Sequence, residues 1–148
     1  MSQLSMSKDE REQFLADLHV GVFSVVDATR AGAPLTAPIW YSYEPGGLVS
    51  VIIGETSQKA RALAAAKAFA LCVQTEQAPY KYVTVEGPVV ATEAVDSTER
   101  RTIAHRYLGA ELGDMYYEST GGDSTAGSIT VRMRPERWLT TDYSKQFG

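Results

Sequence analysis

Apolar residues along this chain follow two periods, which together predict a mixed α and β domain. Short runs rich in β-branched residues, bounded by glycine, proline or polar turns, predict strands, whereas apolar positions three or four residues apart predict helices. The predicted strands span residues 20–26, 35–43, 48–53, 69–74, 80–91 and 128–133, and residues 138–141 extend the last of them. The predicted helices span residues 8–18, 57–67 and 97–108, the first beginning with a capping box at 7–10.

Glycine and proline mark the expected breaks between these elements. Residues 45–47 (Pro-Gly-Gly) predict a hairpin that joins strand 35–43 to strand 48–53, and Gly87 with Pro88 predicts a bulge or bend inside the fifth strand. Gly109 is expected to end the third helix. The segment 113–127 is rich in glycine, serine and tyrosine, and it is interpreted as a mobile loop or a loosely held helical turn.

The third predicted helix has two faces. Charged residues are interpreted as a solvated face, and apolar residues as the packed face. The first set is Glu99, Arg100, Arg101 and Arg106, and the second is Ile103, Ala104, Tyr107 and Leu108.

Pro38 stands inside a predicted strand, where proline cannot donate a hydrogen bond to a neighbouring strand. One reading is a simple edge strand. The other is that the missing hydrogen bond faces a ligand with an amide-like edge of its own. The sequence leaves both open.

A strand, a glycine and a helix follow one another at residues 48–63. Gly54 allows the turn, Ser57 or Thr56 is a good N-cap, and Lys59 and Arg61 fall in the first turns of the helix. Cations are usually found at the opposite end of a helix, where they complement its dipole. These two residues therefore indicate either a bound phosphate or two solvated side chains on an exposed turn.

Composition narrows the classes of function. The 148 residues form one domain, 1–148, with 44% hydrophobic residues, which is enough for a core but little for enclosing a large ligand unaided. A net charge of −4 argues against nucleic acid as a partner. The absence of a long apolar run and of a leader-like start predicts a soluble, cytoplasmic protein without membrane contact. With Cys72, His19 and His105 alone, no metal cluster and no Cys/His nucleophilic pair are expected.

The elements together predict an α+β fold whose strands curl into a small barrel. Side chains fill the interior of a small barrel, so a ligand must lie outside, in a groove that a second subunit could complete. Aromatic residues on the second and fifth strands could stack on a flat heterocycle or, as the preferred reading, bury a dimer face. They are Trp40, Tyr41, Tyr43, Tyr80 and Tyr82. Cys72 is interpreted as a small buried apolar group.

Four segments, 21–26, 34–41, 57–63 and 80–87, carry a family resemblance that covers about residues 15–87 well and the remainder loosely. In order and spacing the chain resembles the pyridoxamine 5'-phosphate oxidase-like split-barrel superfamily. More narrowly, it is similar to the flavin/deazaflavin-dependent oxidoreductases that use the deazaflavin coenzyme factor-420. The resemblance implies a six-stranded antiparallel split β-barrel with flanking helices, forming a homodimer with two cofactor grooves at its interface.

The resemblance also implies which residues bind the cofactor. The strand-to-helix turn would hold its phosphate, and backbone groups of two strands would hold the pyrimidine side of its ring. Two tyrosines at the start of the fifth strand would approach it, and Arg132 or Arg134 would reach over from the partner. The residues are Leu35, Ala37, Pro38, Ile39, Ser50, Ile52, Ser57, Lys59, Ala60, Arg61, Tyr80, Tyr82 and Arg134.

The implied function is hydride transfer from a reduced deazaflavin to an electron-poor small organic substrate. Such a cofactor carries the chemistry, so no catalytic side chain is expected, and the proton could come from solvent, Tyr41 or Tyr116. Where relatives carry an asparagine and two arginines, this chain has Ala62, Ala64 and Ala65, which leaves flavin mononucleotide (FMN) open as the cofactor of an oxidase or flavin reductase. A carrier that binds a ligand without turnover is the third alternative.

Overall fold

The computed structural model describes residues 3–148, which form three α-helices, seven strands and a short 3-10 helix. The helices are α1 (Lys8–Ala16), α2 (Gln58–Ala66), α3 (Ser97–Ser119) and the 3-10 helix η1 (Tyr143–Gln146). The strands are β1 (Gly21–Val25), β2 (Leu35–Ile39), β3 (Val49–Gly54), β4 (Ala68–Gln74), β5 (Lys81–Ala94), β6 (Ser128–Met133) and β7 (Arg137–Asp142).

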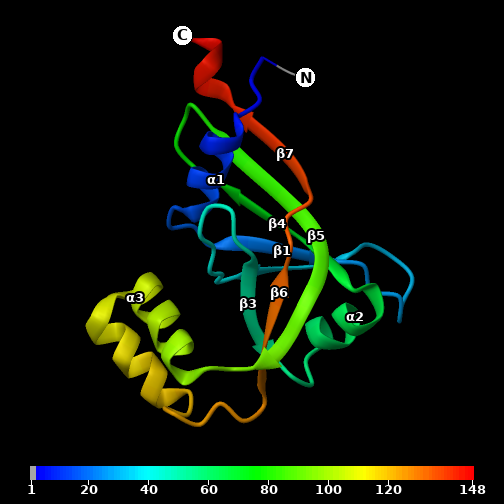
Figure 1. Cartoon of the computed structure of the whole chain (residues 1–148), viewed down its shortest axis with the longest axis vertical. Helices are drawn as coiled ribbons and strands as arrows, with labels where there is room; N and C mark the ends of the chain where they lie inside the picture. The colour runs from blue at the N-terminus through cyan, green and yellow to red at the C-terminus, as the bar shows by residue number, and fades with distance from the viewer. Residues whose placement is uncertain (1–2) are drawn as a thin grey trace.

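Every strand pair is antiparallel, and six strands follow one path in the order β2-β1-β4-β5-β6-β3. The long strand β5 bends and so takes part in both halves of the barrel (Figure 1). Each end of the path is an edge: among the strands of residues 3–148, β2 pairs with β1 alone and β3 with β6 alone, apart from an isolated bridge between Ser50 of β3 and Ser42. The predicted α+β split barrel is therefore confirmed. Residues 138–141 do not extend β6 as predicted; they belong to β7, which pairs with β5.

The backbone after β6 crosses β5 closely at Gly87. The N–H of Arg134 donates to the Pro88 carbonyl at 3.0 Å. A Cβ atom on Gly87 would lie 1.7 Å from the Arg134 carbonyl oxygen, so only glycine fits here. The predicted bulge is present two residues later, where the β5–β6 register shifts between Val89 and Ala91.

The core lies inside the barrel and under α1. Its largest fully buried side chains include Tyr41, Phe23, Leu15, Leu71 and Met133. Cys72, predicted to be buried, is only partly so because it lies on the outer face of β4.

The hairpin predicted between strands 35–43 and 48–53 forms only near its turn, where the Gly47 N–H donates to the Glu44 carbonyl at 2.8 Å and Ser42 and Ser50 exchange two hydrogen bonds. Strand β2 ends at Ile39, and only an isolated bridge joins Ser42 to Ser50. The chain leaves β2 because Tyr41 turns into the core, where its hydroxyl donates to the Leu15 carbonyl at 2.6 Å. Tyr43 is buried as well, so these two aromatic residues fill the chain's own core and not a dimer face.

Helix α1 begins as predicted, since Ser7 and Glu10 form both hydrogen bonds of a capping box. It ends at Ala16, two residues before the predicted Leu18. At that end the Arg106 guanidinium donates to the carbonyls of Ala16 and Asp17, each at 3.0 Å. Arg106 therefore caps α1 and does not belong to a solvated face.

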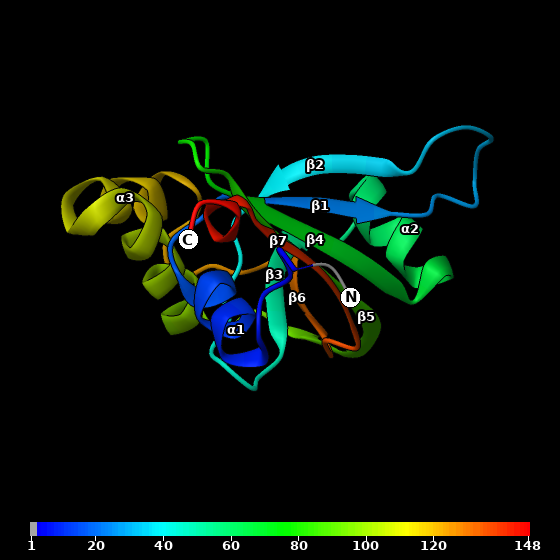
Figure 2. The same cartoon turned by 90° about the horizontal axis from the view of Figure 1, so that it is seen from above.

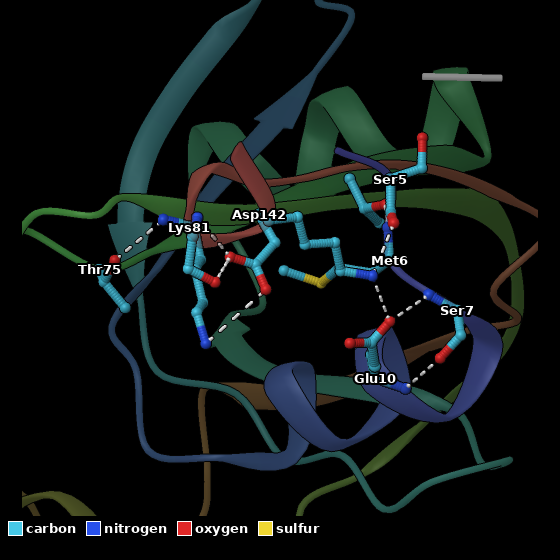
Figure 3. A network of polar contacts seen from close by, with 10 residues as sticks. Ser5, Met6, Ser7, Glu10, Thr75, Lys81 and Asp142 are labelled. Carbon is cyan, nitrogen blue, oxygen red and sulfur yellow. Dashed lines mark hydrogen bonds and ion pairs between the residues drawn. The ribbon is translucent and has the colours of Figure 1, made fainter. Parts of the chain in front are cut away.

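The first turn of α1 lies beside the end of β7 (Figure 3). The Glu10 carboxylate accepts from the Ser7 N–H at 2.8 Å and from the Lys145 ammonium at 2.7 Å. On β5, which pairs with β7, the Lys81 ammonium nitrogen lies 3.9 Å from the carboxylate of Asp142. These contacts fasten both ends of the described chain to the barrel.

Helix α3 is a pair of helices that meet at Gly109, whose φ of 81° interrupts the helical geometry (Figure 1). Gly109 thus ends the first helix, as predicted. The second helix runs through residues 113–119, which were predicted to be a mobile loop or a loosely held helical turn. Gly113 fits against His105, where a Cβ would lie 2.6 Å from the imidazole ring, and Asp114 lies 2.6 Å from His105 Nε2. This close packing orders the segment. None of the helices in residues 3–148 combines the length and apolar content needed to cross a bilayer.

Candidate functional site

A cavity of about 410 Å³ lies between the two open edges of the barrel, under α3. One wall is the end of β2, and the opposite wall is the end of β3. Helix α3 closes a third side. Its lining residues are Val20, Pro38, Ile39, Trp40, Ile52, Ile53, Gly54, Arg100, Ile103, Tyr116, Thr120 and Ser128.

The two strand walls supply backbone polar groups. On the open side of an edge strand, N–H and C=O groups lack a neighbouring strand. Pro38 lies on the β2 edge, so the edge-strand reading is confirmed, and the same residue also lines the cavity. A planar ligand with its own donors and acceptors could pair with both edges.

An aromatic wall stands beside the β2 edge. The ring of Trp40 stacks on Tyr107 with centroids 5.0 Å apart and planes 2° apart, and Tyr116 contacts Trp40 at 5.2 Å. The Tyr107 hydroxyl donates to the His19 carbonyl, which fixes the stack to the chain before β1. Burial raises the pKa of Tyr107. The wall is therefore a fixed surface on which a flat ring could lie.

Of the residues predicted to bind a cofactor, Pro38, Ile39 and Ile52 line this cavity. The other ten do not line it in a single chain. Leu35 and Ala37 lie farther along β2, and Ser57, Lys59, Ala60 and Arg61 lie at the start of α2. Tyr80 and Tyr82 lie at the start of β5, where the Tyr80 carbonyl accepts from the Tyr143 N–H at 2.9 Å. Ser50 and Arg134 are described below.

The start of α2 follows directly from the cavity wall at Gly54. Ser57 is the N-cap, as predicted: its hydroxyl accepts from the Ala60 N–H at 3.2 Å and donates to the Gly54 carbonyl at 2.7 Å. Arg61 folds back, and its guanidinium donates to the Thr56 carbonyl at 2.6 Å. Within residues 3–148, the half-buried Lys59 has no hydrogen-bond or ion-pair partner for its ammonium group. Its charge is thus free for a ligand.

Asp27 holds this end of α2 against the barrel. Its carboxylate accepts from Gln58 Nε2 at 3.1 Å and from the hydroxyl of Thr29 at 2.5 Å. Together with the Thr29 N–H and the nearby Arg30, these donors lower the pKa of Asp27 from 3.8 to about 2, the Thr29 hydroxyl contributing most. The ionised carboxylate therefore stabilises the folded protein.

Asp27→Asn is expected to lower the free energy of unfolding at neutral pH, because the amide cannot accept the same hydrogen bonds. In the wild type this contribution is fully present above the ordinary pKa of 3.8 and is lost as pH falls toward about 2. Urea unfolding of both proteins from about pH 6 down to about pH 2 measures this. The stability difference should shrink across that window; a difference independent of pH would contradict the prediction.

Arg132, one of the two late-strand arginines, lies beneath α3. It pairs with Glu93 at 2.8 Å and Glu99 at 3.1 Å, and its Nη1 donates to Ser50 Oγ at 2.8 Å. The hydrogen bond to Glu93 contributes most to raising the pKa of Arg132, and the hydrogen bond to Glu99 raises it further. Ser50, predicted to face the cofactor, is thus buried under this cluster, in which two carboxylates surround one guanidinium. Arg134 points elsewhere, pairing with Glu136 at 2.6 Å and lining a second cavity beside Trp138.

Arg100 is buried, contrary to the solvated face predicted for it. Only 9% of the residue is exposed. Its Nη1 donates to Thr120 Oγ1 at 2.9 Å, its Nη2 donates to the Gly122 carbonyl, and its guanidinium stacks over the Tyr117 ring at 4.3 Å. The sequence held a signal for this, because Arg100, Ile103 and Tyr107 recur at i, i+3 and i+7 on one helix face. The cavity therefore has a cation in its α3 wall.

Tyr41 and Tyr116, the two predicted proton donors, differ in position. Tyr41 is fully buried and bonded to Leu15, and burial raises its pKa strongly, so it does not reach the cavity. Tyr116 lines the cavity and is 42% exposed. Sequence reasoning did not assign Val20, Ile103 or Thr120 to the site. The segment before β1, helix α3 and the loop after α3 meet at the cavity only in the folded structure. No group of three or more potential metal-binding side chains occurs within the described residues.

Comparison with known proteins finds similarity to solved structures. No family model and no curated protein matches the chain. Among solved structures, an F420 reductase matches with a TM-score of 0.70 and 22% identity over 86% of this chain and 94% of that one. The conserved hypothetical protein Rv2991 from Mycobacterium tuberculosis matches with a TM-score of 0.75 and 18% identity over 100% and 92%. An FAD-binding protein from Mesorhizobium loti matches with a TM-score of 0.61 and 15% identity over 92% and 94%.

The TM-scores of these matches establish a shared fold, and the low sequence identities limit the conclusion to the fold. The matches extend over nearly the whole length of both chains, so the likeness concerns the complete barrel with its helices. This chain therefore has the split-barrel fold of the F420 reductase and of the FAD-binding protein, as the sequence resemblance predicted.

Proposed function

We propose that this protein is an oxidoreductase that binds a deazaflavin, coenzyme factor-420 (F420), in the cavity between β2 and β3 and reduces a small, electron-poor organic substrate. The observation that carries the proposal is the cavity itself: two open strand edges and an aromatic wall face one space, in a fold shared with an F420 reductase. The same donor set suits the flat, amide-edged ring of a flavin or deazaflavin.

The chain's residues would bind such a cofactor at two places. The backbone edges at Pro38–Trp40 and Ile52–Gly54 would hold the polar rim of the ring. Lys59, with Arg61 and the first N–H groups of α2, would hold the phosphate, because a helix N-terminus and a free ammonium both attract an anion.

When bound, a deazaflavin supplies two-electron hydride chemistry. The protein's part is then to position the ring, exclude water and accommodate the substrate. Trp40 and Tyr116 would support the ring or the substrate on one side, and the proton would come from solvent or from the Tyr116 hydroxyl, the one candidate tyrosine at the cavity.

A homodimer with a shared groove is part of the proposal. Aligned residues cross β2, β1, β4, β5 and β7 on the outer face of the sheet without a single charge: Pro38, Val22, Cys72, Thr84 and Leu139. Val22 and Leu139 are 38% and 61% exposed in one chain. This uncharged row suits a second copy, and Pro38 links it to the cavity. It is bounded by Glu86 and Arg137, the next outward-facing residues of β5 and β7. Tyr80, Tyr82 and Arg134 would then approach the groove from the partner.

FMN is the second candidate. Beyond Arg61, the exposed positions Ala64 and Ala65 of α2 bring no further cation. One phosphate would satisfy the cations present, which suits FMN, whereas the longer anionic tail of F420 would extend beyond them.

A pair of titrations tests the cofactor. F420 added to the purified protein is expected to show saturable fluorescence quenching at micromolar concentrations, and FMN is expected to bind at least ten times more weakly, the equivalent of about 1.4 kcal/mol. Reduced F420 should then be oxidised in a single turnover by one of a panel of quinone-like acceptors. Tight FMN binding without F420 binding would reject the deazaflavin in favour of FMN. Binding of F420 without turnover would indicate a carrier.

A further inference from the structure

Arg100 is a buried cation that has no carboxylate partner among residues 3–148. Arginine is seldom buried unless it is paired, because removing its charge from water is costly. Yet the oxygen atoms that accept from its guanidinium, Thr120 Oγ1 and the Gly122 carbonyl, are both neutral. The Nε atom is buried and has no acceptor at all within the described residues. The carboxylate of Asp123 accepts from the Tyr117 hydroxyl instead, at 2.5 Å.

The neighbouring Arg132 shows what a balanced arginine looks like in this protein. Two carboxylates, Glu93 and Glu99, pair with it. Both arginines lie between α3 and the barrel, but only Arg100 lines the cavity. The cavity therefore lies next to a positive charge that no carboxylate of residues 3–148 contacts directly.

This charge is separate from the cations of α2. Helices α2 and α3 lie on opposite sides of β3 in both views (Figure 1 and Figure 2). A ligand whose phosphate is held at Lys59 leaves Arg100 free for a different anion at the other side of the cavity.

We propose that Arg100 binds an anionic group of the substrate, and that the preferred acceptors of this protein are electron-poor molecules bearing a carboxylate. The inference rests on the proposed function and narrows its substrate class. A guanidinium recognises a carboxylate through charge-assisted hydrogen bonds, and Thr120, Gly122 and Tyr117 hold Arg100 in place before the substrate arrives.

The test compares two acceptors that differ in one charge: a naphthoquinone with a propionate side chain and its methyl ester. The side chain is saturated, so the redox properties of the ring are the same. With reduced F420, or reduced FMN if that cofactor binds, the wild type should show kcat/KM for the acid roughly 10- to 100-fold above that for the ester, as expected for a hydrogen-bonded charge pair. Arg100→Gln should abolish this preference, measured as the ratio of the two kcat/KM values within the variant, and Arg100→Lys should retain part of it.

Arg101→Gln is the matched control. It removes the same charge from the next position of α3, where the side chain is exposed and pairs with Asp114. It should preserve the preference for the acid. Equal reduction of both quinones by the wild type would overturn the inference and leave the proposed function standing, even if Arg100→Gln failed to fold. A preference that survives in a folded Arg100→Gln would overturn it as well.

A second measurement needs no cofactor. Benzoate and benzamide have the same shape and differ in charge, and their binding to the wild-type protein is followed through tryptophan fluorescence, since Trp40 lines the cavity. If neither F420 nor FMN binds, the proposed function fails; benzoate binding that exceeds benzamide binding and depends on Arg100 would still support the anion site. Equal binding of the two would overturn it.

Discussion

Gly87→Ala is expected to lower the free energy of unfolding by about 3 kcal/mol or more, at the upper end of the cost of overpacking. The new methyl carbon would lie 1.7 Å from the Arg134 carbonyl oxygen and 2.8 Å from its carbon. Both are backbone atoms, fixed by the hydrogen bond from the Arg134 N–H to the Pro88 carbonyl. The strain cannot be relieved by moving a side chain, so β5 and the β6–β7 connection must separate. The midpoint temperature of thermal unfolding should fall by roughly 6–12 °C.

Gly54→Ala provides the matched control. It makes the same substitution in another strand, but its Cβ would meet Ser57 Cβ at 3.5 Å, an ordinary contact. Its free energy of unfolding should change by less than about 1 kcal/mol. If Gly87→Ala unfolded at the same temperature as the wild type, the result would contradict the close contact between β5 and the residues after β6.

Lys59→Ala is expected to weaken cofactor binding by about 1.5–3 kcal/mol, the range for hydrogen bonds to charged groups, with thermal stability nearly unchanged. The physical reason is that the Lys59 ammonium has no partner within residues 3–148, so its removal breaks no hydrogen bond or ion pair there. Its loss should appear only when an anion is bound. The measurement is the Kd of F420 and of FMN by fluorescence titration, beside a thermal unfolding curve.

Lys67→Ala is the control for this variant. It removes the same charge from the other end of α2, where Lys67 forms the C-cap with a φ of 61°. Cofactor affinity should be unaffected. An unchanged Kd for Lys59→Ala would show that Lys59 is a surface lysine and would remove the phosphate site at α2 from the proposal.

The local structure was largely predictable, because it depends on residues close together in the chain. The capping box at Ser7 and Glu10, the N-cap at Ser57 and the stop at Gly109 are all where the sequence predicts them. Each depends on backbone groups within a few residues of the side chain concerned. The strand periodicity and the family resemblance were likewise enough for the split barrel.

The candidate site was less predictable, because long-range packing builds it. Helical spacing places Arg100 on the packed face, but its burial depends on Thr120 and Gly122, twenty and twenty-two residues later. The second half of α3 is helical because Gly113 and Asp114 pack on His105. Tyr41 was a candidate proton donor, and only the fold revealed that its hydroxyl donates to the Leu15 carbonyl.

By itself, the sequence determined most of the elements, their caps and, through the family resemblance, the barrel, since hydrophobic period, turn residues and capping side chains act over short stretches of chain. The tertiary structure alone decided that β2 and β3 remain unpaired with each other, that α3 folds over the opening between them, and that an arginine without a carboxylate lines the resulting cavity. These features depend on which distant backbone and side-chain groups meet, and the local pattern of residues does not specify those meetings.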